Sequence, residues 1–154
     1  MLVRRCATLF ALSLFWLSAC GPARVFPPPV PTSQNVWSVE FVQTGGFVGV
    51  HLVTEISSSG QMTIEDTRTG RTVSKPLSEA TIRELGQLLA ITEPGENAQL
   101  PSMCADCFLY DLKISSPTGV IRVKADDSTL GQSGALPLID YLREIRDQAL
   151  QSAI

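Results

Sequence analysis

Hydrophobic and polar residues alternate along the chain at 37–42 and again at 48–53, and Gly45-Gly46 separates the two runs. Alternation with a period of two predicts strands, and a short glycine turn between two such runs is typical of a β-hairpin. Shorter apolar pieces at 62–64 and 72–73 predict a third strand and a short fourth one.

A second hairpin is predicted later in the chain, where 108–114 and 120–125 alternate on either side of Pro117-Thr118-Gly119. Between the hairpins, Ser78 is placed to cap a helix that ends near Ile91. Its apolar face, at a spacing of 3.6 residues, consists of Ile82, Leu85, Leu88 and Leu89.

A final amphipathic helix is predicted over the last part of the chain. Its apolar face consists of Leu138, Leu142, Ile145 and Ala149, and the residues expected on its outer face are Arg143, Glu144, Arg146 and Asp147. The element order is β-β-β-(β)-α-β-β-α. This order predicts an α+β fold in which two helices cover one face of an antiparallel sheet of about five strands. Residues 36–154 are expected to form this single domain, which is too short for two cores.

The N-terminus carries an export signal. Arg4 and Arg5 precede an apolar run at 6–17, which is shorter than the roughly 20 residues that span a membrane. Leu17-Ser18-Ala19-Cys20 closes the run and resembles the lipobox of bacterial lipoproteins. An ordinary signal peptide cut nearby and a twin-arginine signal are the alternatives.

The lipobox resemblance implies that residues 1–19 are a cleaved signal peptide and that Cys20 becomes a lipidated N-terminus carrying acyl chains such as palmitate. The membrane is then a partner through the lipid anchor, in the cell envelope. Gly21 is not an acidic retention signal, which favours the outer membrane over the outer face of the plasma membrane.

Residues 20–35 join this anchor to the domain and include five prolines, which predicts an extended linker. Two of the twelve basic residues and none of the fifteen acidic ones lie in 1–19, so the mature chain has a formal net charge of −5. This balance argues against nucleic acid as a partner, because nucleic-acid binding needs clustered Lys or Arg.

Motifs for catalysis are not found in the sequence. His51 is the one histidine, so a zinc site lacks a second imidazole ligand, and a Ser/His/Asp triad could use only His51 as its base. No serine lies in the sequence context of a nucleophile elbow. The pairs Glu65-Asp66 and Asp126-Asp127 are expected to be solvated surface carboxylates, because neighbouring strand residues point to opposite faces. We expect neither an enzyme nor a bound cofactor or metal.

Cys104 and Cys107 are the strongest chemical signal in the domain. In an exported protein, two cysteines this close are expected to form a disulfide that tightens the loop before the strand at 108–114. The alternatives are a redox pair, which normally lies at a helix N-terminus, and a zinc knuckle, which needs two more ligands.

The chain resembles the emfourin family in several successive segments. These are residues 39–50, with the sequence VEFVQTGGFVGV, the leucine-bearing helix, the tyrosine-bearing strand at 107–112 and the strand at 120–123. The resemblance covers most of 36–147, and its hairpin motif consists of Gly45, Gly46, Phe47 and Gly49. It implies a small binding or inhibitory domain directed at a thermolysin-type metalloprotease, with a secreted protease as partner. The alternative is a structural or assembly lipoprotein of the cell envelope.

Overall fold

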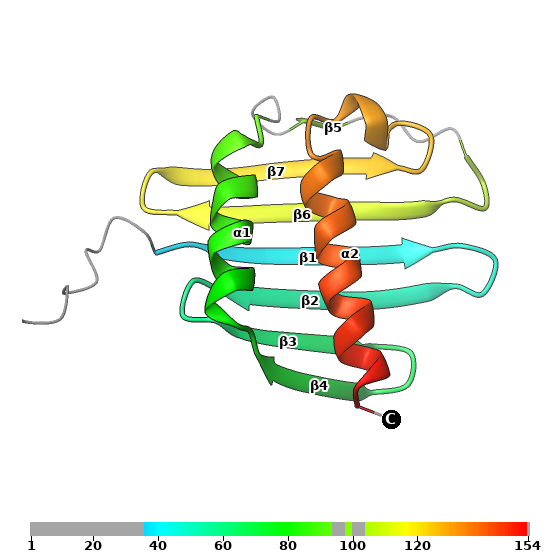
Figure 1. Ribbon diagram of the computed structural model, residues 1–154. Helices are drawn as coiled ribbons and strands as arrows, with labels where there is room; N and C mark the ends of the chain where they lie inside the picture. Colours follow the sequence, from blue (N-terminus) through cyan, green and yellow to red (C-terminus); the bar gives the residue numbers. More distant parts are fainter. Residues whose placement is uncertain (1–35, 94–97, 100–103, 154) are drawn as a thin grey trace, which may run out of the picture. The chain divides into compact units, whose positions relative to one another are not determined.

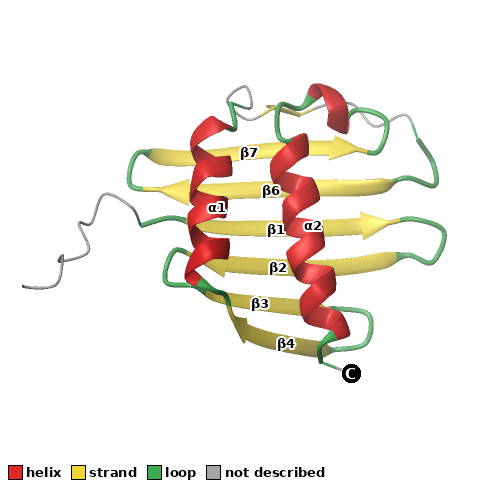
Figure 2. Cartoon of the chain, viewed as in Figure 1, coloured by secondary structure: helices red, strands yellow, loops and turns green. Residues whose placement is uncertain are grey.

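The computed structural model describes residues 36–93, 98–99 and 104–153 (Figures 1 and 2). The elements are, in chain order, β1 (Ser38–Gly45), β2 (Val50–Ser57), β3 (Gln61–Asp66), β4 (Arg71–Pro76), α1 (Glu79–Ile91), β5 (Ala98–Gln99), β6 (Phe108–Ser116), β7 (Gly119–Asp126), the 3₁₀ turn η2 (Leu130–Gln132) and α2 (Leu136–Gln151). The signal segment, Cys20 and the linker lie outside the described residues, so the predictions made for them stay predictions.

The strands of the described residues form one sheet in the order β4-β3-β2-β1-β6-β7-β5. Six of them pair antiparallel, and β1 lies in the middle, paired along its whole length with β2 and β6. The short fourth piece is a full strand, β4. The two-residue strand β5 pairs parallel to β7 and was not expected, because two residues show no alternation.

Both helices cross the same face of the sheet, which confirms the predicted α+β architecture (Figure 1). The core lies between the helices and this face. Its largest fully buried side chains are Phe41, Ile56, Met62, Ile64, Leu85, Tyr110, Leu112, Leu138, Ile139 and Leu142. Among the described residues, every buried core residue falls within 39–149, so the described core lies wholly inside residues 36–154.

The helix boundaries follow from local chemistry. The Ser78 hydroxyl accepts a hydrogen bond from the Thr81 amide at 3.1 Å, as an N-cap does, and Glu79 places a carboxylate in the first turn of α1. At the C-terminus of α1, the Thr92 hydroxyl donates to the Leu88 carbonyl at 2.6 Å. In α2, Pro137 stands in the first turn, where its missing N–H leaves no helical hydrogen bond unmade.

The expected exposure of Arg146 is wrong. Its side chain is 3 % exposed, and Cζ lies 5.8 Å from the centroid of the Phe41 ring. Arg146 lies one helical turn after Leu142, which places it on the buried face of α2. Burial is tolerated because Nη1 donates to Oε1 of the buried Gln43 at 2.8 Å and Nε donates to Oδ1 of Asp147 at 2.9 Å.

Candidate functional site

The β1–β2 connection is a tight turn over residues 46–49, called the Phe47 turn below. The Gly49 amide donates to the Gly46 carbonyl at 2.9 Å, so Phe47 and Val48 occupy the two central positions. Their side chains are 96 % and 65 % exposed. Val48 was expected to begin the second strand, but β2 starts at Val50.

Glycine is required at the base of this turn. Gly45 has a φ of +89°, and a Cβ built on it would lie 2.6 Å from the carbonyl oxygen of Cys107. The next amide, that of Gly46, donates to the same oxygen at 3.2 Å. Any side chain at position 45 would therefore push the turn away from the segment that supports it.

That supporting segment contains the predicted disulfide. Cys104 and Cys107 are bonded, with their Cα atoms 5.5 Å apart, directly before β6. The bond confines the backbone that offers the Cys107 carbonyl to Gly46. The disulfide thus fixes local geometry at the Phe47 turn, as expected for a short staple.

Asp127 ties the same segment to the end of β7. Its two carboxylate oxygens accept from the Phe108 amide at 2.8 Å and from the Tyr110 hydroxyl at 2.5 Å. Burial raises the pKa of Tyr110 to about 12, and the hydrogen bond to Asp127 acts in the same direction. The phenol therefore stays protonated and keeps donating at any physiological pH.

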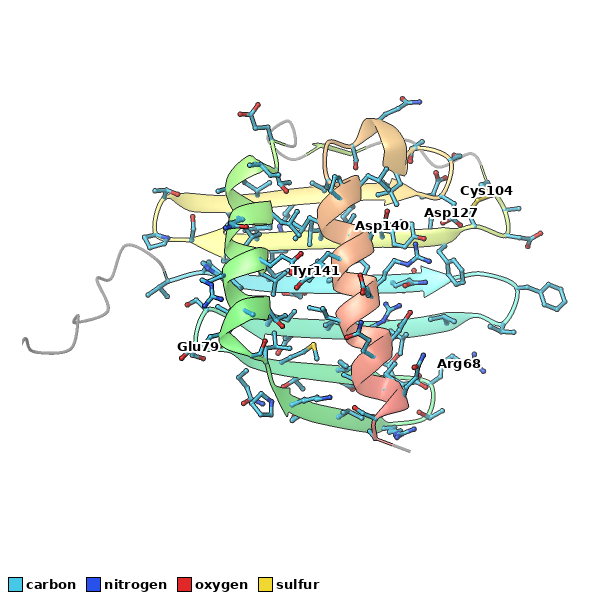
Figure 3. All side chains as sticks on the ribbon, in the orientation of Figure 1. Arg68, Glu79, Cys104, Asp127, Asp140 and Tyr141 are labelled. Carbon is cyan, nitrogen blue, oxygen red and sulfur yellow. A yellow bond between two sulfur atoms is a disulfide. The ribbon has the colours of Figure 1, made fainter. Side chains whose placement is uncertain are left out.

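On the other side of the turn, Arg68 donates from Nη1 to the Val48 carbonyl. Arg68 lies in the β3–β4 turn, where Asp66 accepts from the Arg68 amide at 3.0 Å and from the Thr69 hydroxyl at 2.9 Å. The hydrogen bond from Thr69 is the main cause that lowers the pKa of Asp66. Figure 3 shows Arg68, Cys104 and Asp127 toward the same end of the strands.

The arrangement holds the backbone of the Phe47 turn from both sides and leaves its apolar side chains in solvent. The motif residues Gly45, Gly46, Phe47 and Gly49 and the two cysteines therefore meet at one end of the sheet. Sequence reasoning missed Arg68, and it identified Asp127 only as a surface carboxylate, which is exposed as expected. The contacts of both residues were missed because they cross between turns and strands that are distant in the sequence.

The other candidate residues lie elsewhere. His51 is exposed on β2, as expected, and Glu65 is exposed on β3. The prediction that Asp126 is a solvated carboxylate is wrong, since this residue is fully buried. Its Oδ1 accepts from the amides and hydroxyls of Ser128 and Thr129 at 2.6–2.9 Å. Asp followed by Ser and Thr is an Asx-turn signal that could have indicated this.

Within the part of the chain that the structure describes, no group of three or more His, Cys, Asp or Glu residues is placed to hold a metal ion. Among the same residues, no helix is both long and apolar enough to cross a membrane. Neither the comparison with protein-family models nor that with curated proteins finds a match to this chain.

Proposed function

We propose that this protein is a lipid-anchored binding module of the cell envelope whose Phe47 turn inserts into a protein partner. The observation that carries the proposal is the 96 % exposure of Phe47 at the tip of a turn whose backbone is held by neighbouring segments. A large aromatic side chain in solvent costs hydration free energy, and burying one at an interface is a common source of binding energy.

The support around the turn favours binding over a merely exposed loop. Hydrogen bonds from Gly46 to Cys107 and from Arg68 to Val48 hold the backbone before any partner arrives. A held backbone loses less conformational entropy on binding, so more of the contact energy remains as affinity. The disulfide contributes to this by confining Cys107.

The partner we propose is a secreted metalloprotease of the thermolysin type, which the module inhibits. This part of the proposal rests on the resemblance of residues 39–50 and of the later strands to the emfourin family. A rigid turn with an exposed apolar residue suits such a target, because a cleft that accepts apolar side chains can receive Phe47. A lipid anchor on Cys20, which the lipobox resemblance implies, would hold the module at the membrane surface, where it can meet secreted proteases.

The test is a titration of several thermolysin-type proteases with residues 36–154, comparing the wild type with Phe47→Ala. We expect stoichiometric inhibition by the wild type and about thirtyfold weaker inhibition by the variant, as for a typical interface anchor. Val120→Ala is the matched control, because Val120 is 51 % exposed and lies toward the other end of the sheet, opposite Ser115. This control should inhibit like the wild type.

Mass spectrometry of the inhibitor after incubation separates inhibition from slow digestion as a competing substrate. An intact chain is expected at full inhibition. If the folded wild type inhibits none of these proteases, the protease proposal is wrong and the structural role in the envelope takes its place. Equal inhibition by Phe47→Ala would show that the turn is not the contact.

A further inference from the structure

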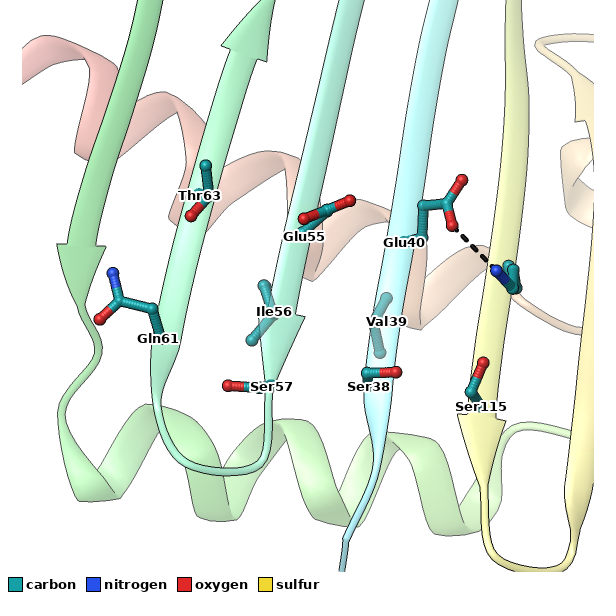
Figure 4. A pocket seen from close by; sticks show the side chains of 10 residues that line it. Ser38, Val39, Glu40, Glu55, Ile56, Ser57, Gln61, Thr63 and Ser115 are labelled. Carbon is teal, nitrogen blue, oxygen red and sulfur yellow. Dashed lines mark hydrogen bonds and ion pairs between the residues drawn. The ribbon is translucent and has the colours of Figure 1, made fainter.

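The face of the sheet opposite α1 and α2 is uncovered within the described residues (Figure 1). Its side chains come from alternate positions of the strands and are mostly polar or charged. A hollow of about 320 Å³ lies on this face, and Glu40, Glu55 and Lys113 are among the residues that line it (Figure 4). This surface is called the open face below.

One row of charges on the open face is sorted by strand, beside a separate Asp111–Lys124 ion pair that joins β6 to β7 at 3.0 Å. In this row across β2, β1, β6 and β7, Glu55 lies opposite Glu40, Glu40 opposite Lys113, and Lys113 opposite Arg122. The row therefore reads negative, negative, positive, positive. Its two halves meet at the Glu40–Lys113 ion pair, in which Nζ and Oε2 are 3.1 Å apart.

The outer members of this row lack partners of opposite charge. Among the described residues, neither Glu55 nor Arg122 forms an ion pair, and both are exposed. Each instead lies directly opposite a residue of its own charge on the neighbouring strand. Like charges directly opposite each other on a sheet face are destabilising, so the isolated chain carries two unfavourable pairs.

Consider a second copy related to the first by a two-fold axis that lies in front of the open face, parallel to the strands and above the line between β1 and β6. Rotation about this axis brings the negative half of the row in one copy over the positive half of the row in the other. It places β1 of one copy over β6 of the other and β2 over β7. Each Glu40 then faces a Lys113, and each Glu55 faces an Arg122, across the interface. A two-fold axis perpendicular to the strands would place like charges over each other, so the charge pattern favours one geometry.

We propose that two copies of this protein associate through their open faces about this axis. Both sheets would then have their strands nearly aligned, which is a common way for two sheets to pack. Six strands about 4.8 Å apart, with strand lengths near 20 Å, give a face of roughly 500 Å² per copy. Two such faces reach the roughly 1,000 Å² that a specific interface needs. The inference does not depend on the proposed protease target.

The test uses charge reversal at two positions in residues 36–154, measured by sedimentation equilibrium at up to about 100 µM, where a micromolar dimer is fully visible. The wild type should be dimeric and should dissociate as salt is raised, because the contacts are ionic. Glu55→Lys alone and Arg122→Glu alone should each weaken association by at least roughly tenfold, since both symmetric contacts become repulsive.

Mixing the two variants is the decisive measurement. In a mixed dimer, Lys at position 55 faces Glu at position 122, and the native Arg122 faces the native Glu55, so association should return to the wild-type level. Each variant also places opposite charges next to each other within its own sheet, which favours the native fold. Arg83→Glu on the exposed side of α1 is the control with the same charge change and should leave association unaltered.

A wild type that remains monomeric at these concentrations overturns the proposal. So does a dimer that either reversal leaves intact, since it would form through another surface. If the mixture of the two variants stays monomeric while each is folded by circular dichroism, the pairing of Glu55 with Arg122 is wrong and the proposed axis fails with it.

Discussion

Nη1 of Arg146 on α2 donates to Oε1 of Gln43 on β1 over 2.8 Å, and both side chains are at least 95 % buried. This contact fastens the last helix to the central strand with polar groups inside an otherwise apolar core. Burial of a cation is tolerated only when its hydrogen bonds are kept, so each partner depends on the other.

Removing one side of this pair should destabilise the fold more than removing both. Gln43→Leu leaves an Arg146 donor buried without its acceptor, and we expect a loss of about 1–3 kcal/mol in the free energy of unfolding. Adding Arg146→Met should recover part of that loss. Urea unfolding of the wild type, both single variants and the double variant gives the coupling energy. Strictly additive losses would show that the contact contributes nothing to stability.

Replacing Gly49 or Gly45 with alanine should lower the free energy of unfolding by unequal amounts, although both glycines have a positive φ. Gly49 has a φ of +63° and open space around its Cβ position, so Gly49→Ala should cost about 1 kcal/mol from backbone strain alone. Gly45→Ala adds a clash 2.6 Å from the Cys107 oxygen and should cost about 2–3 kcal/mol. Thermal or urea unfolding compares the two, and equal losses would mean that the close approach at Gly45 is relieved without cost.

The disulfide should contribute modestly to stability. Its closed loop is so short that the chain-entropy model gives only about 2 kcal/mol, and Cys104→Ser with Cys107→Ser should lose no more than that. The amide of Gly46 should exchange faster with solvent in this variant, because the Cys107 carbonyl that accepts from it is no longer confined. Two free thiols in the denatured exported protein would contradict the bond.

Stability should fall at alkaline pH as Tyr110 ionises. Burial and the Asp127 hydrogen bond raise its pKa from 10.0 to about 12, so the native state holds this proton more tightly than the unfolded chain. The contribution, at most about 3 kcal/mol, is complete below pH 10 and is lost as the pH rises from about 10 to about 12. Tyrosinate absorbance is the readout.

Tyr141 needs to be separated from Tyr110 in that titration, because burial and a hydrogen bond to Glu84 also raise the pKa of Tyr141 to about 12. The Tyr141→Phe variant leaves Tyr110 as the one tyrosine that titrates. Adding Asp127→Asn should then lower the Tyr110 pKa only in part, since burial is the larger cause. A Tyr110 pKa near 10 in the folded Tyr141→Phe protein would contradict both its burial and its contact with Asp127, and a pKa that Asp127→Asn leaves unchanged would contradict the contact alone.

The anchor can be tested in cells that export the protein. Cys20→Ser removes the residue that the lipobox resemblance marks for lipidation, so the protein should leave the membrane fraction or remain unprocessed. Fractionation and mass spectrometry of the N-terminus report this. Recovery of a correctly cleaved, membrane-bound Cys20→Ser protein would refute the lipoprotein hypothesis.

Local periodicity was sufficient to predict most of the fold. The alternation at 108–114 and 120–125 matches β6 and β7, in which Leu112 and Val123 pair and are both fully buried. The N-cap at Ser78 is likewise present. Such features depend on residues near each other in the chain, so a single sequence contains the information.

Long-range pairing decided what the sequence could not show. The spacing from Leu142 already places Arg146 on the buried face of α2, but only the packing of α2 on β1 supplies its partner Gln43, which lies 103 positions earlier in the chain. In the same way, the pattern around Cys107 does not reveal that its carbonyl lies against Gly46; only the pairing of β1 with β6 makes that contact.

By itself, then, the sequence determined the class of fold, the disulfide and the order of the elements, because helix and strand periods and turn residues act over a few positions. The tertiary structure alone decided which partner the buried Arg146 has and where the Phe47 turn is supported. It also decided that Glu55 and Arg122 lie in one row of the sheet. Strand register sets the support of the turn and the row of charges, while helix packing sets the partner of Arg146, and both are fixed only when distant segments pack into one core.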